Sequence, residues 1–391
     1  YNWADEISRW RPGDAESITV LQSTDDLPRK LSDWTVITYG MVSRHLEGLQ
    51  KAGFKSLVVD EAHYIKNLDA KRTQAVLQLV APTKTSPGGK LIGSRLAVTG
   101  TPITNRPPEL FPLLVFLGKK QRNEEAAILE RYTIRALAGD QSIFVGYQHL
   151  DELHASIKPF TLRRLKRDVL SQLPPKIYRP IYTAITNAAE YHRAEVDFLE
   201  WLRLAVGDEA VERIEFSVRA QILVQLNYLR QLAARGNVQP VADFLKPCGE
   251  TGHKVLVFST FLEVLESLQE AKGGIIYTGA TGREERNDLV KRFQSTPSEC
   301  FFFGSIGAAG VGITLTAADR VVFVDLPWTP AAKSQAEDRA HRIGQTKPVE
   351  IVPFLARGTV DERIMQLISD KEKIIGQVID GLDAARASLE S

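Results

Sequence analysis

The chain has 391 residues, of which 43% are hydrophobic and 25% are charged, so it can bury more than one hydrophobic core and we expect two or three domains. It contains no apolar run near the roughly 20 residues of a membrane span and no signal segment, so we expect an intracellular protein without a membrane partner. Two cysteines, Cys248 and Cys300, are too few for a disulfide framework or a zinc cluster, and the formal net charge of +1 leaves a nucleic-acid partner open.

Short apolar runs rich in β-branched residues alternate with longer amphipathic stretches along the chain, which is the pattern of parallel sheets flanked by helices. A first group of strands is expected at residues 36–38, 56–60 and 96–99, and a second group at residues 254–259, 274–277, 300–303, 320–325 and 349–354. Between the groups, residues 187–235 have a helical period and almost no strand signal. The sequence therefore predicts an α/β fold with two sheets joined by a helical insertion.

A final helix is expected to begin at a capping box, Thr359-Val360-Asp361-Glu362. Its apolar residues on one side, which indicate packing rather than a cofactor site, are Ile364, Leu367, Ile368, Ile375 and Val378. The predicted domains are residues 1–118 around the first sheet, 119–245 as helical insertion and linker, 246–358 around the second sheet, and 359–391 as a helix packed on the core.

Two adjacent acids, Asp60 and Glu61, stand at the end of the strand expected at residues 56–60. Carboxylates in this position can hold Mg²⁺ through Asp60, while Glu61 orients or deprotonates the water that attacks a γ-phosphate. A helix N-terminus, which favours acids in its first turn, is the alternative for these residues alone. The sequence therefore offers both acids as catalytic and metal-binding residues.

Two further segments bear on the same chemistry. Residues 96–102 form a strand that runs into a Gly-Thr-Pro turn, and alone they would be a plain strand end followed by a loop. Within residues 335–345, Arg339 and Arg342 are three residues apart, which places both guanidinium groups on one face of an expected helix, within reach of a transferring phosphoryl group. A solvated charged helix is the alternative, but Gln335 and the Gly344-Gln345 stop make the longer pattern more specific.

Taken in order, these segments resemble the helicase-type motors of superfamily two, and specifically the Swi/Snf family. Five segments match that family's motifs in order: the DEAH-type box at residues 60–63, the third motif at 100–102, the fourth at 254–261, the fifth at 310–318 and the sixth at 335–345. Residues 163–168 and 173–176 are similar to the family's signature between the lobes. Residues 106–110 and 305–309 lean toward the annealing-helicase (HARP-like) branch.

The resemblance implies two RecA-like lobes, with ATP and Mg²⁺ as cofactors. It also implies nucleotide contacts from Asp60, Glu61, His63, Gly312, Gln335, Arg339 and Arg342. The motor would be a DNA-dependent ATPase.

One part of the family's nucleotide site has no counterpart in the sequence. The glycine-rich loop ending in Gly-Lys-Ser/Thr follows a strand and opens a helix, whereas Gly-Gly-Lys at residues 88–90 and the stretch at 249–254 each precede a strand. Residues 1–7, which begin without Met, resemble a segment beyond that loop. We therefore expect the first lobe to be truncated, its loop to come from a missing segment or a partner, and this chain alone to be inactive.

A DNA surface is expected from small residues at strand ends and from one basic cluster. Residues that match the family's DNA-facing motifs, and that suit phosphates rather than base edges, are Thr38, Ser259, Thr278, Gly279 and Thr314. Trp328 corresponds to an aromatic placed against the tracked strand, with an interface-filling Trp as an equal alternative. Arg163, Arg164 and Lys166 form the basic cluster, for which a solvated or interlobe charged helix is the alternative.

The resemblance implies a translocase in which ATP and Mg²⁺ lie between the acids of one lobe and the arginines of the other, and in which closure and hydrolysis move double-stranded or branched DNA. Two alternatives stay open, namely a DNA-binding or regulatory fragment without catalysis and a strand-separating helicase. Such a protein would work in the cytoplasm or nucleoid if bacterial or phage, which the alanine-rich helices slightly favour, or in the nucleus if eukaryotic.

Overall fold

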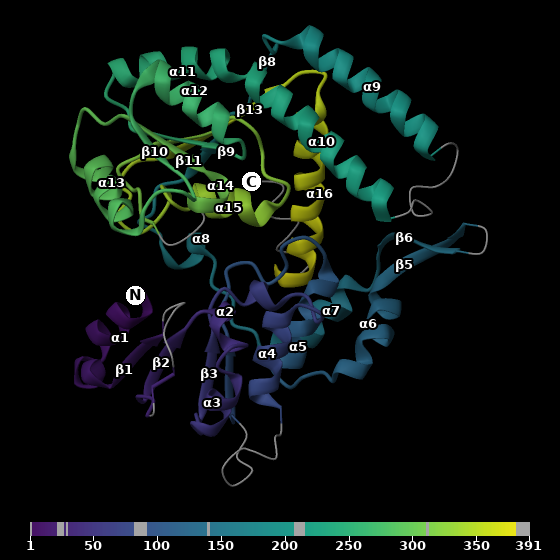
Figure 1. Ribbon diagram of the computed structural model, residues 1–391, viewed down its shortest axis with the longest axis vertical. Helices are drawn as coiled ribbons and strands as arrows, with labels where there is room; N and C mark the ends of the chain where they lie inside the picture. The colour runs from purple at the N-terminus through teal and green to yellow at the C-terminus, as the bar shows by residue number, and fades with distance from the viewer. Residues whose placement is uncertain are drawn as a thin grey trace. The chain divides into compact units, whose positions relative to one another are not determined.

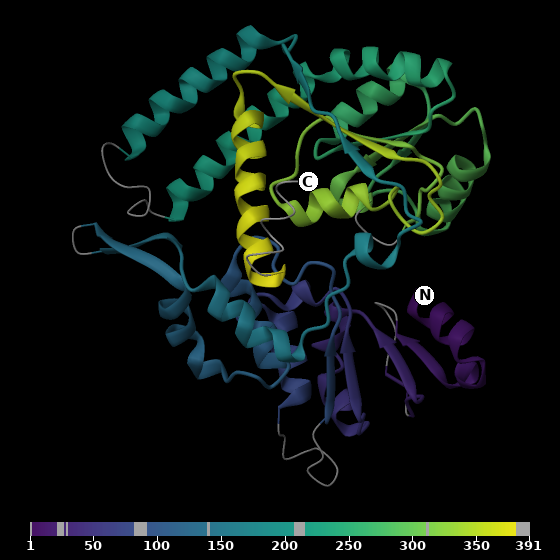
Figure 2. The same cartoon turned by 180° about the vertical axis from the view of Figure 1, so that it is seen from behind.

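The computed structural model describes residues 2–21, 27–28, 30–81, 92–138, 141–206, 216–309 and 313–380. The chain forms two compact units, which can be followed in Figures 1 and 2. The first unit consists of Tyr1–Arg135 with Phe144–Leu153, and the second of Ala136–Ile143 with His154–Ser391.

The first unit contains two pairs of parallel strands: β1 (Ile18–Leu21) with β2 (Trp34–Ile37), and β3 (Ser56–Val59) with β4 (Ser94–Ala97). Its helices are α1 (Asn2–Trp10), α2 (Tyr39–Val42), α3 (Leu46–Lys51), α4 (Lys71–Val80), α5 (Phe111–Phe116) and α6 (Glu125–Tyr132), and α7 (Leu150–Ile157) crosses from the first unit into the second. The 3-10 turn Ala62–Ile65 packs against α4 and α5, and Ala62 and Ile65 are fully buried. The core of the unit therefore anchors the segment that directly follows Asp60 and Glu61.

The second unit is built on one parallel sheet. Its strands run in the order β10 (Ile275–Tyr277), β11 (Phe301–Ser305), β9 (Val255–Ser259), β12 (Arg320–Phe323), β13 (Val349–Ala356) and β7 (Lys176–Tyr178), and β8 (Ile181–Thr183) also pairs with β13. After the edge strands β7 and β8, the chain enters the centre of the sheet at β9 and then continues on both sides of it, as in doubly wound folds, which bind ligands at the carboxyl ends of their strands. The loops after β9, β10 and β12 are therefore where functional residues are expected.

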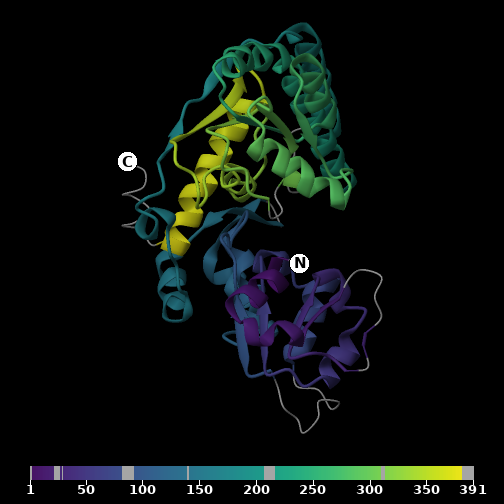
Figure 3. The ribbon, with the colours of Figure 1, turned by 90° about the vertical axis from the view of Figure 1, so that its left-hand side faces the viewer.

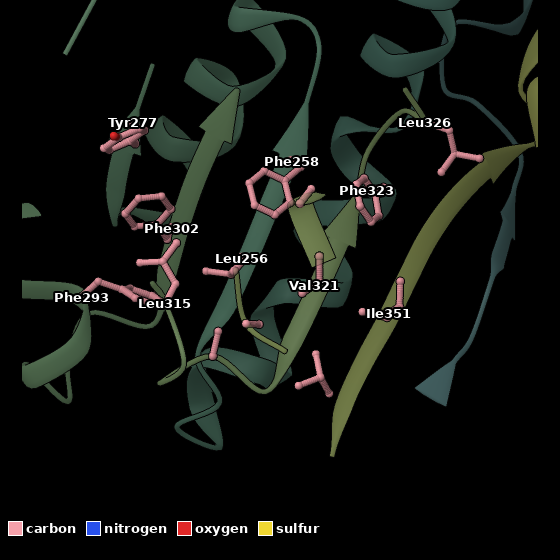
Figure 4. Close-up of a cluster of buried hydrophobic side chains, with 14 of the residues drawn as sticks. Leu256, Phe258, Tyr277, Phe293, Phe302, Leu315, Val321, Phe323, Leu326 and Ile351 are labelled. Atoms are coloured by element: carbon pink, nitrogen blue, oxygen red, sulfur yellow. The ribbon is translucent and has the colours of Figure 1, made fainter. Parts of the chain in front are cut away.

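Both faces of this sheet are buried, which explains why its strands are continuous apolar runs. Leu256 and Phe258 pack in the layer that is covered by α13 (Arg283–Ser295), α15 (Pro330–Glu337) and α16 (Val360–Asp380). Val255 and Val257 face the opposite layer, which is covered by α11 (Val238–Glu250) and α12 (Leu262–Lys272). Figure 4 shows the first of these layers, where phenylalanines from neighbouring strands lie side by side.

The remaining helices of the second unit are α8 (Lys166–Val169), α9 (Ala188–Val206), α10 (Phe216–Gly236) and α14 (Ile306–Ala309). α9 and α10 pack against each other, and α10 also contacts α16, the long yellow helix in Figure 3. The helical insertion expected at residues 187–235 is therefore helical throughout its described part. It is fixed to the second unit through α16.

The expected fold class is confirmed, since the strands of the two units' main sheets pair in parallel within an α/β arrangement and each expected strand is found within two residues of its place. Five strands were not expected: β1, β5 (Thr133–Ala138), β6 (Gln141–Tyr147), β7 and β8, of which β5 and β6 form a sheet of their own. β7 and β8 fall in residues 119–245, so part of the predicted insertion belongs to the second sheet.

The final helix begins as expected but its cap differs from a capping box in both contacts. The Thr359 hydroxyl accepts a hydrogen bond from the Asp361 N–H (3.2 Å) instead of from Glu362, and the Glu362 carboxylate accepts from the Gly358 N–H (3.4 Å) instead of from Thr359. Ile364, Ile368 and Val378 are buried, whereas Leu367 is 38% exposed. The expected apolar side of the helix is therefore packed at these three residues, and Leu367 lies outside it.

Candidate functional site

Asp60 and Glu61 lie immediately after β3, where the chain leaves the sheet. The Asp60 side chain is exposed. Its Oδ1 accepts a hydrogen bond from the Glu61 N–H (2.9 Å) and its Oδ2 accepts one from the Trp3 indole (2.7 Å). The Tyr39 hydroxyl donates to the Asp60 carbonyl oxygen (2.6 Å), and burial, with the charges of Asp60 and Glu61 nearby, raises the pKa of Tyr39. Tyr39 therefore stays protonated and holds the backbone at the end of the strand.

Glu61 has a left-handed backbone conformation, with φ 47° and ψ 50°. Among the described residues that are not glycine, only His149 shares a positive φ. Hydrogen bonds on both sides fix this turn, since the Ala62 N–H donates to the Val98 carbonyl (3.0 Å) and the Tyr64 N–H donates to the Glu61 carbonyl (2.9 Å). Strained backbone of this kind concentrates at functional sites, where the surrounding structure holds it in place.

The acids are connected to the Gly-Thr-Pro turn through His63. Its Nδ1 lies 3.3 Å from Glu61 Oε2 and 3.4 Å from the Thr99 hydroxyl, which in turn accepts a hydrogen bond from the Thr101 N–H (3.1 Å). The His63 side chain is 13% exposed and the Glu61 side chain 46%. The structure thus brings together the two segments at residues 60–63 and 99–101 that the sequence picked out separately. It leaves the Glu61 carboxylate open to solvent.

The acids fit a magnesium ion by their chemistry. Mg²⁺ prefers oxygen ligands and is usually bound through one or two carboxylates together with substrate phosphates and waters. Asp60 offers an exposed carboxylate whose two oxygens each accept one hydrogen bond and retain further lone pairs. In the described part of the chain, no cluster of three or more His, Cys, Asp or Glu side chains could hold a metal by itself. A metal at Asp60 would therefore share its coordination with a phosphate.

The two arginines of residues 335–345 are not on a helix, which corrects the expectation that they share a helical face. α15 is capped by Thr329, whose hydroxyl accepts from the Ala332 N–H (3.3 Å), and it ends at Glu337. Residues 338–345, the arginine loop, follow as turns. Arg339 is 8% exposed and its Nη1 donates to the Ile313 carbonyl (3.2 Å), whereas Arg342 is exposed. Gln335 lies within α15 and is partly buried.

Three anchors hold the arginine loop. Gln345 donates to the carbonyls of Thr316 (3.0 Å) and Ala318 (2.7 Å). The His341 ring hydrogen-bonds the Pro174 carbonyl (2.7 Å), and burial lowers the pKa of His341 despite that bond, so the ring is neutral and donates through Nε2. At the start of the loop, buried Glu337 accepts from Lys176 (2.8 Å) and from the Tyr178 hydroxyl (2.9 Å). The segment at residues 173–178 therefore braces the loop that carries both arginines.

The residues expected to contact DNA are placed differently from one another. Thr38, Gly279 and Arg164 are exposed, Thr278 and Thr314 are partly buried, and Trp328 is 37% exposed. Arg163 pairs with Asp380, and Lys166 pairs with Asp338 (2.8 Å) and donates to the His341 carbonyl (3.1 Å). Gly312 falls outside the described residues. The basic cluster therefore has intramolecular partners at two of its three positions.

Ser259 does not lie where a phosphate could reach it. It is fully buried, its hydroxyl donates to Asp325 Oδ1 (2.5 Å), and it accepts from the Phe261 N–H (3.1 Å). The expectation from its place at a strand end is therefore wrong for Ser259. The next residue, Thr260, is exposed, but its hydroxyl accepts a hydrogen bond from the buried Arg230 (3.4 Å).

The sequence reading missed a buried ion pair. Arg230 of α10 and Asp325 at the end of β12 are both 1% exposed, and Arg230 Nη2 lies 3.1 Å from Asp325 Oδ2. The sequence does show Arg230 as a charged residue among apolar residues of an expected helix. It does not show that Asp325 is its partner.

Comparisons with known proteins cover nearly the whole chain. Residues 1–234 match the SNF2-related domain and residues 236–344 match the helicase conserved C-terminal domain. The protein is 33% identical to the DNA annealing helicase and endonuclease ZRANB3 of Bos taurus over 97% of this chain and 36% of that protein. It is 29% identical to the SWI/SNF-related matrix-associated actin-dependent regulator of chromatin subfamily A member 1 of Homo sapiens over 97% of this chain and 38% of that protein.

The chain thus spans little more than a third of the length of these relatives. The Sulfolobus solfataricus SWI2/SNF2 ATPase core in complex with dsDNA aligns with 100% of this chain and 82% of its own at 26% identity, with a TM-score of 0.43 that is too low to bear on the fold. No helix in the described residues has the length and apolar character of a membrane span. The two domain matches cover the segments that carry the motifs, in the same order along the sequence. The chain therefore belongs to the family of SNF2-related domains.

Proposed function

We propose that this chain is the motor part of an ATP-driven translocase on double-stranded DNA. The observation that carries the proposal is the connection of Asp60 and Glu61 to Thr99 through His63, in a chain that belongs to the SNF2-related family. An acid pair held at a strand end and coupled to a hydroxyl turn is the arrangement that ATP hydrolysis requires of this half of the site.

In the proposed reaction, Glu61 orients the attacking water and takes up its proton, because its carboxylate is exposed and its backbone is fixed by the surrounding turn. Asp60 would hold Mg²⁺ together with the phosphates, and the bound ion would supply positive charge to the transferring group. His63 holds the Glu61 carboxylate in register with Thr99. Arg342 and Arg339 would stabilise the charge of the transition state, while Gln335 and Gly312 would complete the nucleotide contacts.

The duplex would be held through its phosphates. Thr38, Thr278, Gly279, Thr314 and Arg164 are the proposed contacts, with Trp328 placed against one strand and Arg163 and Lys166 nearby; Ser259 is excluded by its burial. Phosphate contacts carry no sequence information and are screened by salt. We therefore propose sequence-tolerant, salt-sensitive binding. By similarity to the annealing helicases, we also propose a preference for branched DNA.

ATPase assays test the proposal in a longer chain that carries a phosphate-binding loop ahead of these residues. Glu61→Gln should keep nucleotide binding while DNA-stimulated hydrolysis falls steeply, and Arg342→Ala should lower the rate by about 10³-fold, since an arginine that stabilises the transition state is worth that much. Arg193→Ala, which removes an exposed arginine of α9, is the matched control. Arg339 is buried, so its replacement by Ala must be checked for folding first. Parental hydrolysis by the Arg342 variant would show that this arginine is not catalytic.

If the chain binds duplex DNA but the longer chain hydrolyses no ATP, it is a binding or regulatory module instead. Measuring duplex affinity at several salt concentrations tests this alternative. Affinity that falls as salt rises shows binding through phosphates, whereas no binding at low salt excludes a DNA-binding module.

A further inference from the structure

Arg230 lies in α10, in the helical insertion, yet its guanidinium group reaches the carboxyl end of the second sheet. It is 1% exposed. Its Nη2 donates to Asp325 Oδ2 (3.1 Å), to the Leu326 carbonyl (2.7 Å) and to the Thr260 hydroxyl (3.4 Å). Its Nη1 donates to Asn227 Oδ1 (3.3 Å), so both outer nitrogens of the planar guanidinium group are held.

The same carboxylate connects Arg230 to the loop after β9. Asp325 Oδ1 accepts from the Ser259 hydroxyl (2.5 Å) and from the Thr260 N–H (3.0 Å), while Oδ2 faces Arg230. Both partners of the ion pair are 1% exposed, and each has several hydrogen bonds. Breaking such a pair by removing one partner leaves an uncompensated buried charge, which is costly. The turn that presents Thr260 is therefore bonded to both members of the pair, through its N–H to Asp325 and through its hydroxyl to Arg230.

Arg230 also backs the Trp328 side chain. The guanidinium carbon is 4.6 Å from the centroid of the Trp328 ring, within the range of a cation–π contact, and it is 5.6 Å from that of Phe261. The indole is 37% exposed, and the Trp328 carbonyl accepts a hydrogen bond from Lys371 of α16 (3.2 Å). The ring is thus in contact with a buried cation while part of it stays open to solvent, where it can contact a DNA strand.

We propose that Arg230 is a positioning residue for DNA contact, which orients the Trp328 ring and, through Asp325, the Thr260 turn. This rests on the proposed function, since Trp328 is a proposed DNA contact. The arginine acts from the insertion and touches no DNA itself, because it is buried. A purely structural ion pair is the competing explanation, and it predicts no special effect on the Trp328 ring.

The ring is tested without DNA, by ¹⁹F NMR of the chain labelled with 5-fluorotryptophan. The chain has five tryptophans, and Trp328→Phe identifies the resonance of Trp328. Arg230→Lys keeps the charge but loses the fork and the planar group, so the Trp328 resonance should move toward that of a solvated indole. The resonances of Trp3, Trp10 and Trp34, in the first unit, should not move. Arg235→Lys, on the same helix but exposed and paired with Glu263, is the matched control and should leave Trp328 unchanged.

Arg230→Lys could fail to fold, since it disturbs a buried pair. A second variant, Arg230→Met combined with Asp325→Asn, removes both charges and leaves none unpaired. The cation behind Trp328 is lost in this variant as well, so the same movement of the Trp328 resonance is expected. An unmoved resonance in whichever variant folds overturns the proposal.

Duplex affinity gives the functional test. Truncation of a tryptophan that contacts a binding partner can weaken binding by about 10-fold or more, so Arg230→Lys, which disturbs Trp328, should weaken duplex binding by about 10-fold. If Arg230 acts through Trp328, Arg230→Lys should have little further effect once Trp328→Ala is present, and fully additive losses would overturn the proposal. Absence of duplex binding by the unaltered chain would instead refute the proposed function, while the NMR result would still report whether Arg230 orients Trp328.

Discussion

The left-handed backbone at Glu61 makes a prediction at the scale of a single residue. A side chain in this conformation costs roughly 1–2 kcal/mol, whereas glycine adopts it freely. Glu61→Ala and Glu61→Gly both lose the carboxylate, and they differ in that cost and in the larger entropy that glycine loses on folding, roughly 0.5–1 kcal/mol in the opposite direction. We therefore expect the Gly variant to be more stable than the Ala variant by about 1 kcal/mol in urea denaturation.

Glu47, in helix α3, provides the control for this comparison. Its backbone is helical, so the order should reverse there and Glu47→Ala should be the more stable of the pair. Equal stability of the Ala and Gly variants at position 61 would contradict the strain assigned to it.

The stability of the second unit should depend on pH through Asp361. Burial, with Asp325 nearby, raises the pKa of Asp361 from 3.8 to about 7, although a hydrogen bond from the Ala356 N–H and the charge of Arg230 oppose the shift. Between these two pH values the folded state binds more protons than the unfolded state, so this residue makes stability fall as pH rises. Asp361→Asn keeps an acceptor for Ala356 and cannot ionise.

We expect the Asp361→Asn variant to gain in Tm relative to the unaltered protein as pH increases from 4 to 8. Thermal unfolding followed by circular dichroism at several pH values measures this. Asp370→Asn, an exposed position on the same helix, should leave the pH dependence unchanged. Parallel curves for the Asp361 variant and the unaltered protein would show that Asp361 has an ordinary pKa.

At the scale of elements, the contact between α15 and β7 depends on Glu337. It is 1% exposed and lies between Lys176 (2.8 Å) and Lys333 (3.2 Å); burial would raise its pKa, but the two lysines outweigh burial and lower it. Glu337→Gln removes the buried carboxylate that both lysines share and leaves them only the more exposed Asp338 and Glu372, which should cost about 3 kcal/mol of the free energy of unfolding.

Glu372 provides a matched comparison, because it pairs with the same Lys333 at 3.8 Å but is half exposed. Glu372→Gln should cost under about 1 kcal/mol, as is usual for exposed pairs. Urea denaturation of both variants measures the free energy of unfolding. Equal losses in the two variants would show that the buried contacts of Glu337 with Lys176 and Lys333 add no special stability.

The elements that the sequence predicts well are those with a local signal. β9 and β12 are runs of apolar residues between turns, and a strand buried on both faces must look like this. The end of α15 has no such signal, because the contact of His341 with Pro174 comes from a segment 167 residues away. β7 and β8 have only three residues each and lie close to prolines, so their pairing with β13 could not be read locally.

As with the helices and strands, the sequence located those site residues that have a local pattern. Asp60 and Glu61 could be located because strand-end acids form a contiguous pattern, and the roles given to them and to the arginines stay predictions. Ser259 was misplaced because position along the sequence does not tell which side of a turn a hydroxyl faces. Arg230 was missed because its partner, Asp325, is 95 residues away.

At the scale of the whole molecule, the kinds of residue proposed to meet DNA favour translocation over unwinding. They are small hydroxyls, glycine, basic side chains and one tryptophan, without the aromatic series that stacks unpaired bases in single-strand channels. In a longer chain with a phosphate-binding loop, we expect ATP-dependent displacement of a third strand from a triplex but no processive unwinding of a plain forked duplex. Efficient fork unwinding without triplex displacement, measured with the same protein and ATP, would favour a helicase.

The pairing of β7 and β8 with β13 has a consequence for how the protein is made. Arg179 and Glu350 form an ion pair across this edge although 171 residues separate them. During synthesis, β7 therefore leaves the ribosome long before β13, its neighbour in the sheet, has been made. Until then the backbone N–H and C=O groups of residues 176–183 lack their partners in β13. Contacts between distant parts of a chain slow folding and leave strand edges open to other chains. We expect nascent chains that stop before residue 349 to be captured by chaperones or to aggregate, and chains that extend past residue 380 to become protease-resistant.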